Sequence, residues 1–382
     1  MLRNLRNLII NIMAAFIRDR DARHKFRDKY KRKSKFRKLR DDNRVLFKQN
    51  AVLKAEIQEI KNDLNSIKAQ NYFVYSPIVV TTYKNFFLQI DGEELIEKYN
   101  NLIKGLDNDS IKCVSQILSR AKLISEQDPE KVGAIDIFTS EEKLQIDKVK
   151  KEFHQQIIKL SNECWAYRQY IFPISKPEVT SLYYKHQIDH LKNIDGLKEK
   201  DFLDVGCYIG DSAVAFTEFT KGKIYSFEPV SAFYDLTLKT IEMNGCTNII
   251  PINIALGSKD ENMTIHINGV GSSLTMNTTG YRQNSKTEII KVTTLDNFVK
   301  GKNIDIGLIK VDIEGFEQEF LKGAEQTIRK YKPTLLISIY HNASDFFNIK
   351  PIIESWDLGY SFKISHPITG GLMAETLLIC EQ

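Results

Sequence analysis

Apolar segments rich in Val, Ile and Phe alternate with helical patterns from residue 201 onward, and this alternation constrains the fold more than any other feature. Strands that alternate with helices predict parallel β-α-β units, with a sheet covered by helices on both faces. In such sheets, ligands bind beyond the carboxyl ends of the strands. The expected strands cover residues 201–205, 223–227, 248–254, 305–311 and 334–340.

The ends of the first two expected strands carry residues that suit a nucleoside ligand. Gly206 and Gly210 follow the first strand, where glycine lets the backbone turn tightly and approach a ligand. The third glycine of the nicotinamide-enzyme pattern is missing. Glu228 and Pro229 follow the second strand, and a carboxylate there can accept hydrogen bonds from both ribose hydroxyls. The order and spacing of the turn and the acid together predict a nucleoside site.

A group of acids follows the fourth expected strand, and a histidine follows the fifth. Asp312, Glu314 and Glu317 lie within six residues of one another, and His341 ends the next apolar segment. If the two strands are neighbours, His341 lies beside Asp312 and Glu314. An imidazole near its ordinary pKa can accept a proton from a sugar or alcohol hydroxyl. The alternative is a purely structural histidine.

These motifs together resemble the FkbM-type methyltransferases, a branch of the class I S-adenosylmethionine-dependent enzymes. The resemblance covers about residues 180–382, and Phe316 stands where the family more commonly has alanine. Tyr340-His341-Asn342 followed by Asp345-Phe346-Phe347 resembles a bacterial subgroup often encoded with surface-polysaccharide genes. The matching segments are Ile309 to Glu317 (IKVDIEGFE), Leu321 to Ala324, Lys332-Pro333, Asn253 to Gly257 (NIALG) and the turn Ser272 to Leu274.

The resemblance implies a Rossmann-like, seven-stranded methyltransferase sheet with a reversed hairpin near residues 359–365 and 373–379. It also implies an enzyme that transfers a methyl group from S-adenosylmethionine to oxygen, often to a sugar hydroxyl. We therefore expect an O-methyltransferase that acts on a surface glycan or its precursor. We expect this α/β domain to span residues 178–382, preceded by a helical region and an N-terminal coiled coil.

The motifs and the resemblance together predict the residues of the site. We assign His341 as the general base, Asp312 as the group that orients the acceptor or cofactor, and Glu314 as its support. We assign no metal ligands, although an alternative has Asp312 and Glu314 bind a divalent cation that acidifies the hydroxyl. The expected cofactor-binding residues are Asp204, Gly206, Tyr208, Gly210, Asp211, Ser212, Glu228, Pro229, Asn253, Ala255 and Asp312.

The first 38 residues form a basic arm. Residues 1–40 hold 15 Lys or Arg against three Asp, whereas the whole chain has a net charge of +5, so the remainder is acidic. The apolar segment from Leu8 to Ile17 is shorter than the ~20 residues of a membrane span. It also lacks a signal-peptide cleavage site. An interfacial helix is an alternative. We expect the arm to contact an anionic surface, and we favour lipid over nucleic acid.

Residues 39–71 show a heptad pattern typical of a coiled coil. Leu39, Leu46, Leu53, Ile60 and Ile67 lie seven apart, and a second series lies four residues after the first four of them, at Asn43, Asn50, Ile57 and Leu64. Two asparagines, at positions 43 and 50, occupy core positions of this second series, and buried Asn at such positions favours a parallel dimer. The sequence therefore predicts a homodimer through this segment. The alternative is a single amphipathic helix that folds back on its own domain.

Residues 72–177 are the least informative segment, and we interpret them as a helical linker domain without chemistry. Helical patterns occur near 93–105 and 109–125, and Thr139 with Glu142 has the spacing of a capping box that opens a helix through Leu160. The five cysteines are scattered without a C-x-x-C pair. This pattern argues against a disulfide framework and favours a cytoplasmic protein. A peripheral location at the inner face of the membrane is the alternative.

Two other classes of function compete with the glycan methyltransferase. One is a coiled-coil scaffold that carries a ligand-binding but inactive methyltransferase-like fold. The other is a nucleic-acid methyltransferase, which the basic arm suggests. Enzymes that methylate base amines often carry an Asn/Asp-Pro-Pro-Tyr/Phe motif after the fourth strand, and Asp312 to Gly315 lacks it. We therefore do not expect a nucleic-acid partner.

Overall fold

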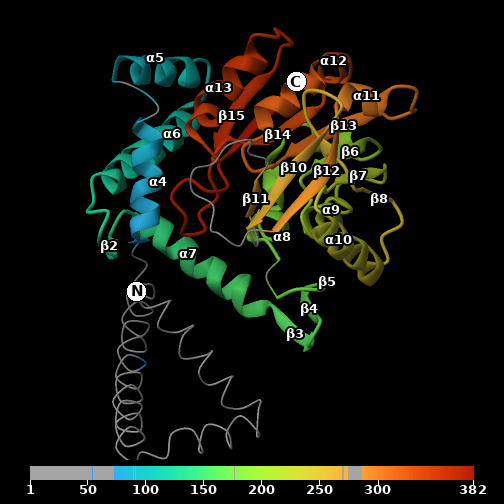
Figure 1. Ribbon diagram of the computed structural model, residues 1–382, viewed down its shortest axis with the longest axis horizontal. Helices are drawn as coiled ribbons and strands as arrows, with labels where there is room; N and C mark the ends of the chain where they lie inside the picture. The colour runs from blue at the N-terminus through green and yellow to red at the C-terminus, as the bar shows by residue number, and fades with distance from the viewer. Residues whose placement is uncertain are drawn as a thin grey trace, which may run out of the picture. The chain divides into compact units, whose positions relative to one another are not determined.

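The structure is a computed structural model, and it describes residues 54, 73–88, 90, 92–175, 177–268, 271–273 and 286–382. Residues Asn71–Gln382 form one compact unit (Figure 1). The expected boundary at residue 177 falls inside this unit. The basic arm and, except for Lys54, the coiled coil lie outside the described residues, as does Leu274 of the expected turn.

A seven-stranded sheet forms the centre of the unit, with the strand order β15-β16-β14-β13-β6-β7-β8. Strands β14, β13, β6, β7 and β8 run parallel to one another, and β16 lies antiparallel between β14 and β15. The Rossmann-like sheet and its reversed hairpin are thereby confirmed. The strands are β6 (Asp201–Val205), β7 (Ile224–Phe227), β8 (Ile249–Ile252), β13 (Ile306–Val311), β14 (Thr334–Ser338), β15 (Ser361–Ser365) and β16 (Leu377–Glu381).

Helices bury both faces of this sheet, which explains why its central strands are apolar throughout. Phe202 and Leu308 face the side covered by α9 and α10, whereas Leu203 and Ile309 face the side covered by α11, α12 and α13. All four of these side chains are fully buried. The helices are α9 (Asp211–Phe216), α10 (Ser231–Asn244), α11 (Leu295–Val299), α12 (Glu317–Tyr331) and α13 (Ala343–Glu354).

A second, four-stranded sheet with the order β11-β10-β12-β9 follows β8. The sequence analysis did not predict it. Its buried side chains, among them Ala255 and Ile265, form a small core with Val230 and the partly buried Phe316. This sheet therefore borders the carboxyl ends of the main strands. Its strands are β9 (Ala255–Leu256), β10 (Glu261–Asn268), β11 (Gly271–Ser273) and β12 (Lys286–Thr293).

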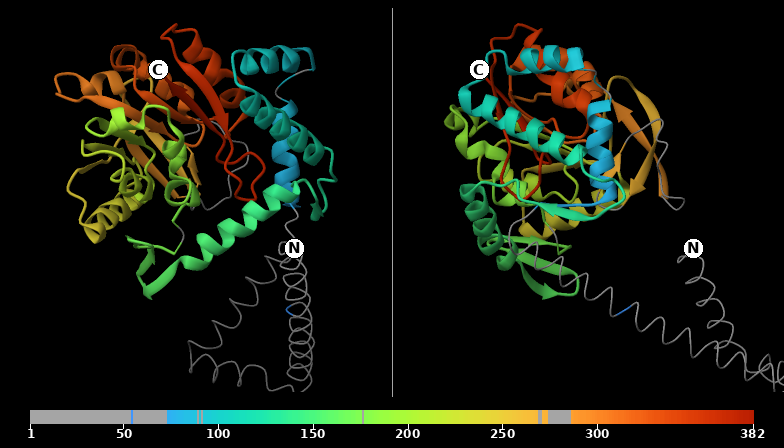
Figure 2. Two further views of the ribbon diagram at one scale, coloured as in Figure 1. Left: turned by 180° about the vertical axis from the view of Figure 1, so that it is seen from behind. Right: turned by 90° about the vertical axis from the view of Figure 1, so that its left-hand side faces the viewer.

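Helices that precede the main sheet in the chain pack beside its β15 edge (Figure 2). The backbone N–H of Ile364 in β15 donates to Ser110 Oγ at 2.9 Å, and the ring of Phe86 lies edge-on to Phe346, 5.9 Å between centroids. These contacts join the N-terminal helices to the core of the sheet domain. The helices are α4 (Pro77–Leu88), α5 (Gly92–Ile103) and α6 (Asn108–Ser125).

The helix that Thr139 opens is shorter than the sequence predicts. The capping box between Thr139 and Glu142 is confirmed, and α7 (Ser140–Glu152) follows it. The expected continuation through Leu160 is wrong, because Ile158 pairs with Ala166 across a hairpin and Leu160 lies in its first strand. Strand pairing thus overrides the helical spacing. The hairpin strands are β3 (Ile158–Ser161), β4 (Cys164–Tyr167) and β5 (Tyr170–Phe172).

The remaining elements of the described chain are short. Strands β1 (Phe73–Tyr75) and β2 (Gly133–Ile135) pair antiparallel. Helix α8 (Val179–Leu182) leads into β6 through the 3-10 turns Lys185–His190 and Ile194–Leu197, and another such turn, His154–Gln156, follows α7. Among the helices of the described segments, none is both long and apolar enough to cross a bilayer.

We predict that Gly323→Ala destabilises the protein by about 1–3 kcal/mol, the usual cost of overpacking. A methyl group at Gly323 in α12 would come 1.9 Å from the carbonyl oxygen of Gly257. Chemical denaturation measures the change. Gly92→Ala in α5 is the matched control, because nothing lies within 4 Å of an added Cβ there. Equal stabilities of the two variants would contradict this close packing of α12.

Candidate functional site

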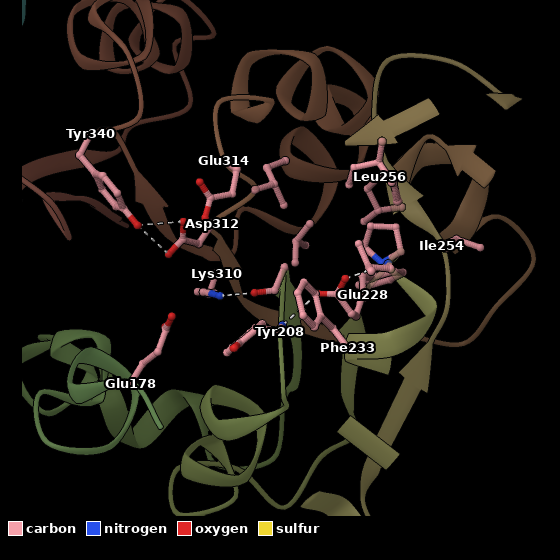
Figure 3. A pocket seen from close by; sticks show the side chains of 18 residues that line it. Glu178, Tyr208, Glu228, Phe233, Ile254, Leu256, Lys310, Asp312, Glu314 and Tyr340 are labelled. Atoms are coloured by element: carbon pink, nitrogen blue, oxygen red, sulfur yellow. Dashed lines mark hydrogen bonds between the residues drawn. The ribbon is translucent and has the colours of Figure 1, made fainter. Parts of the chain in front are cut away.

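A pocket lies at the carboxyl ends of β6, β7 and β13 (Figure 3). It has about 810 Å³ of empty volume, part of which is open to solvent. Asp312 and Glu314 lie along one part of its wall, and Glu228 lies among the apolar side chains that line the other. The lining residues are Glu178, Val205, Gly206, Tyr208, Phe227, Glu228, Pro229, Val230, Phe233, Ile254, Ala255, Leu256, Ile265, Lys310, Asp312, Ile313, Glu314 and Tyr340.

The glycine turn after β6 forms one wall of the pocket. Gly206 has φ +84°, and a Cβ on it would lie 1.9 Å from the carbonyl oxygen of Asp312, so only glycine fits between the two strand ends. Tyr208 has φ +50°, and its backbone N–H donates to Glu228 Oε2 at 3.1 Å. The turn after β6 and the acid after β7 therefore meet as predicted.

Glu228 is 6% exposed and is held by backbone donors. Besides Tyr208, the N–H of Val230 donates to its Oε1 at 2.9 Å. Burial raises the pKa of Glu228 to about 8, against the opposing effect of these two hydrogen bonds. Each carboxylate oxygen keeps a further lone pair. Asn253 Nδ2 donates to the carbonyl oxygens of Glu228 and Pro229, at 2.8 and 3.1 Å, and so fixes this loop.

A buried ion pair lies behind the turn. Lys310 Nζ is 3.2 Å from Asp204 Oδ1, and the two side chains are 5% and 0% exposed. Lys310 also donates to the carbonyl oxygen of Gly206 at 2.7 Å, and Ser212 Oγ donates to Asp204 Oδ2 at 2.6 Å. Burial opposes the charge of Lys310, but Asp204 and Asp312 outweigh it and raise its pKa. The pair thus connects the ends of β6 and β13.

Some of the predicted cofactor residues lie behind the pocket wall and not on it. Asp204 belongs to the ion pair, Ser212 donates to it, and Gly210, at φ +81°, precedes α9 in the left-handed conformation. Asp211 is buried, and its Oδ2 accepts from the backbone N–H of Glu178 at 2.7 Å. These residues hold the turn in shape. Those that line the pocket as predicted are Gly206, Tyr208, Glu228, Pro229, Ala255 and Asp312.

The predicted acid and imidazole cluster is present at the next two strand ends. His341 Nε2 lies 3.3 Å from Asp312 Oδ1 and 3.8 Å from Glu314 Oε2, while Nδ1 lies 3.0 Å from Glu317 Oε1. Burial disfavours charge on His341, but the carboxylates of Asp312 and Glu317 outweigh it and hold its pKa well above the usual value. For Asp312, burial by itself would raise the pKa, but the neighbouring His341 and Lys310 lower the pKa of this carboxyl group to about 2.

This geometry bears on the role assigned to His341. Its side chain is 8% exposed, both nitrogens face carboxylates, and it does not line the pocket. Glu314 and Tyr340 do line it (Figure 3). The Glu314 side chain is 44% exposed, its backbone has φ +58°, and burial raises its pKa to about 7. Glu314 is therefore the better placed of the two to meet a ligand in the pocket.

Several lining residues were missed in the sequence. Glu178 lies before the first strand of the sheet, where no motif marks it. Ile265 comes from the unpredicted small sheet, and Phe233 comes from the first turn of α10. Lys310 did carry a signal, because a lysine inside an apolar strand requires a buried partner.

Residues 204–362 match the family model described as the Methyltransferase FkbM domain. The match confirms the resemblance found in the sequence and, with it, a domain of the S-adenosylmethionine-dependent methyltransferase class. The chain has no significant match among curated proteins.

Many solved structures resemble parts of the chain, among them the following three. Methyltransferase FkbM from Methylobacillus flagellatus KT is 19% identical with a TM-score of 0.47, over 75% of this chain and 58% of that chain. An rRNA methylase from Streptococcus thermophilus is 13% identical with a TM-score of 0.31, over 55% and 98%. Aeropyrum pernix fibrillarin, with natively bound S-adenosyl-L-methionine, is 13% identical with a TM-score of 0.32, over 52% and 72%. The chain thus spans 58% of the first structure's length. At these TM-scores, the methyl acceptors of the three proteins do not identify the acceptor of this chain.

We predict that Asp204→Asn lowers the free energy of unfolding by about 3 kcal/mol, because it leaves the buried Lys310 charge without its partner. Asp305→Asn is the matched control. Asp305 pairs with Lys200 at 2.7 Å at the opposite ends of the same two strands, but those side chains are 65% and 42% exposed. Its loss is expected to cost less than about 1 kcal/mol. Chemical denaturation compares the two variants, and equal losses would contradict a special role for the buried pair.

Proposed function

We propose that this chain, whose residues 204–362 form an FkbM methyltransferase domain, transfers the methyl group of S-adenosylmethionine to a sugar hydroxyl of a surface glycan or its precursor. In that reaction the bond from sulfur to the methyl carbon breaks while a bond from the hydroxyl oxygen forms. The sulfur keeps the electron pair and becomes a neutral thioether, and the hydroxyl proton leaves. Because the sulfonium loses its charge, catalysis depends largely on positioning.

The observation that carries this proposal is the Glu228 carboxylate beside the backbone of Gly206 and Tyr208. S-adenosylmethionine supplies an activated methyl group and a ribose with two hydroxyl donors. The free lone pairs of Glu228 suit those hydroxyls. The apolar side chains of Phe233 and Leu256 line the same pocket and suit the flat face of an adenine. The residues present therefore fit the cofactor.

The opposite part of the pocket wall suits a hydroxyl acceptor. Asp312, Glu314 and Tyr340 all reach it, and the Tyr340 hydroxyl lies 3.4 Å from both carboxylate oxygens of Asp312. Carboxylates accept hydrogen bonds from sugar hydroxyls, and a phenol can both donate to them and accept from them. Glu314 takes the acceptor proton, since it faces the pocket and His341 does not. Asp312 orients the acceptor. These acids also disfavour a polyanionic nucleic acid as acceptor.

The N-terminal segments enter the proposal on sequence grounds alone. A homodimer through residues 39–71 and a contact of residues 1–40 with an anionic lipid surface at the inner face of the membrane would bring the pocket near lipid-linked glycan precursors.

We predict that Glu228→Gln weakens S-adenosylmethionine binding by about 10- to 100-fold at a pH above the Glu228 pKa of about 8, because hydrogen bonds to a charged group contribute about 1.5–3 kcal/mol each. Isothermal titration calorimetry measures the dissociation constant. Glu242→Gln on the exposed face of the adjoining helix α10 is the matched control and is expected to bind like the wild type. An unchanged dissociation constant for Glu228→Gln would rule out ribose recognition by this carboxylate.

We predict that Glu314→Gln lowers kcat by about 10²–10⁴-fold while S-adenosylmethionine binds as in the wild type, the range expected when a general base is lost. Transfer of labelled methyl from the cofactor into a panel of nucleotide sugars and glycans gives the rate. Glu319→Gln, in the first turn of α12 and paired with Lys322, is the control. A wild-type enzyme that labels no member of the panel would contradict the sugar acceptor.

A further inference from the structure

Three potential metal ligands converge beside the pocket. Asp312, Glu317 and His341 each offer one ligand atom, and these atoms all lie within 4.8 Å of one another. Asp312 follows β13, Glu317 is the first residue of α12, and His341 follows β14. Three separate elements therefore bring these side chains together, and Asp312 also lines the pocket.

Two side chains of the cluster are buried, and three of its polar atoms lack aligned partners, although Glu317 Oε1 accepts from the backbone N–H of Ile313 at 2.9 Å and Asp312 accepts from the Tyr340 hydroxyl. Glu317 is fully buried, and the His341 side chain is 8% exposed. Among the residues that the structure describes, neither imidazole nitrogen of His341 has a hydrogen-bond partner of good geometry. The same holds for Oε2 of Glu317. Buried polar groups without such a partner are costly, and an unplaced ion is one of their recognised explanations.

The charges of the cluster favour a cation. Asp312 and Glu317 approach the imidazole from either side, and Glu314 lies 3.8 Å from its Nε2. Lys310, the cation of the same motif, is already paired with Asp204. Several carboxylates are therefore gathered around one histidine in a region of low exposure, where a divalent cation would offset their repulsion.

We propose that Asp312, Glu317 and one imidazole nitrogen of His341 bind a divalent metal ion of the Mn²⁺ type. Mixed carboxylate and imidazole ligands suit first-row divalent ions. The 3.0 Å separation between His341 Nδ1 and Glu317 Oε1 is close to the roughly 3 Å expected between two adjacent ligand atoms that each lie about 2.1 Å from an ion.

The ion deepens the proposed function, and its catalytic role rests on that function. Asp312 belongs to both the cluster and the pocket wall, so the ion lies next to the place of the acceptor hydroxyl. A bound cation lowers the pKa of a hydroxyl that contacts it, and the oxygen that attacks the methyl group is then more strongly nucleophilic. Binding of the metal ion itself, however, needs neither S-adenosylmethionine nor an acceptor.

Direct titration with Mn²⁺ tests the site on the full chain, after removal of metals with a chelator and without an affinity tag. Electron paramagnetic resonance is expected to find one bound Mn²⁺ per chain, with nitrogen coupling in the electron spin echo signal. Glu317→Gln is expected to weaken binding at least about 10-fold, and His341→Ala to abolish the nitrogen coupling. Glu325→Gln, further along α12 and paired with exposed Arg329, is expected to bind like the wild type.

Absence of bound Mn²⁺ in the wild type, or equal binding by the wild type and Glu317→Gln, overturns the metal site. Circular dichroism and S-adenosylmethionine calorimetry on each variant identify a variant that has failed to fold. If one of the variants Glu317→Gln and His341→Ala fails to fold, the other is used for the test. The two proposals also fail separately. A wild-type protein that binds Mn²⁺ but not S-adenosylmethionine contradicts the methyltransferase and leaves the metal site standing.

Discussion

The buried ion pair between Lys310 and Asp204 is the interaction on which the rest of the site depends. It joins the carboxyl ends of the two central strands, β13 and β6, and Lys310 also holds the carbonyl oxygen of Gly206. The glycine turn consequently has one position relative to Asp312, whose carbonyl oxygen leaves no room for a Cβ. A buried charge is costly unless it is paired, so the pair tolerates little change on either side.

The proposed function divides the carboxylates of the pocket between two tasks. Glu228 is held by backbone N–H groups and lies among apolar walls, an environment that suits recognition of a neutral diol. Asp312 and Glu314 line the same pocket, and His341 contacts both of them and, through its other nitrogen, Glu317. The imidazole, which the sequence suggested as a base, is enclosed by acids and faces them with both nitrogens. Its surroundings are those of a ligand or counter-charge, and Glu314 faces the pocket in its place.

Strands, turn and acids were predictable because each is a local signal in the chain. Continuous apolar segments mark strands buried on both faces, and Gly206 and Glu228 stand at strand ends that parallel pairing must bring to one edge. Leu160 was misplaced because the strand that contains it pairs with β4, a contact that the local helical spacing does not reveal. Glu178 and Ile265 reach the pocket from elements whose packing no spacing reveals.

By itself, the sequence determined the parallel β-α-β strands and the meeting of the turn with Glu228, because apolar periodicity is a local signal and the carboxyl ends of parallel strands share one edge of a sheet. The seven-stranded sheet and its reversed hairpin were implied by the resemblance to the FkbM-type methyltransferases. The tertiary structure decided which predicted residues face the pocket and which stand behind it. It also decided that His341 lies between Asp312 and Glu317, since that depends on how β13, β14 and α12 pack. Protonation, exposure and ligand geometry arise from distances between elements, and these are set only when the elements come together.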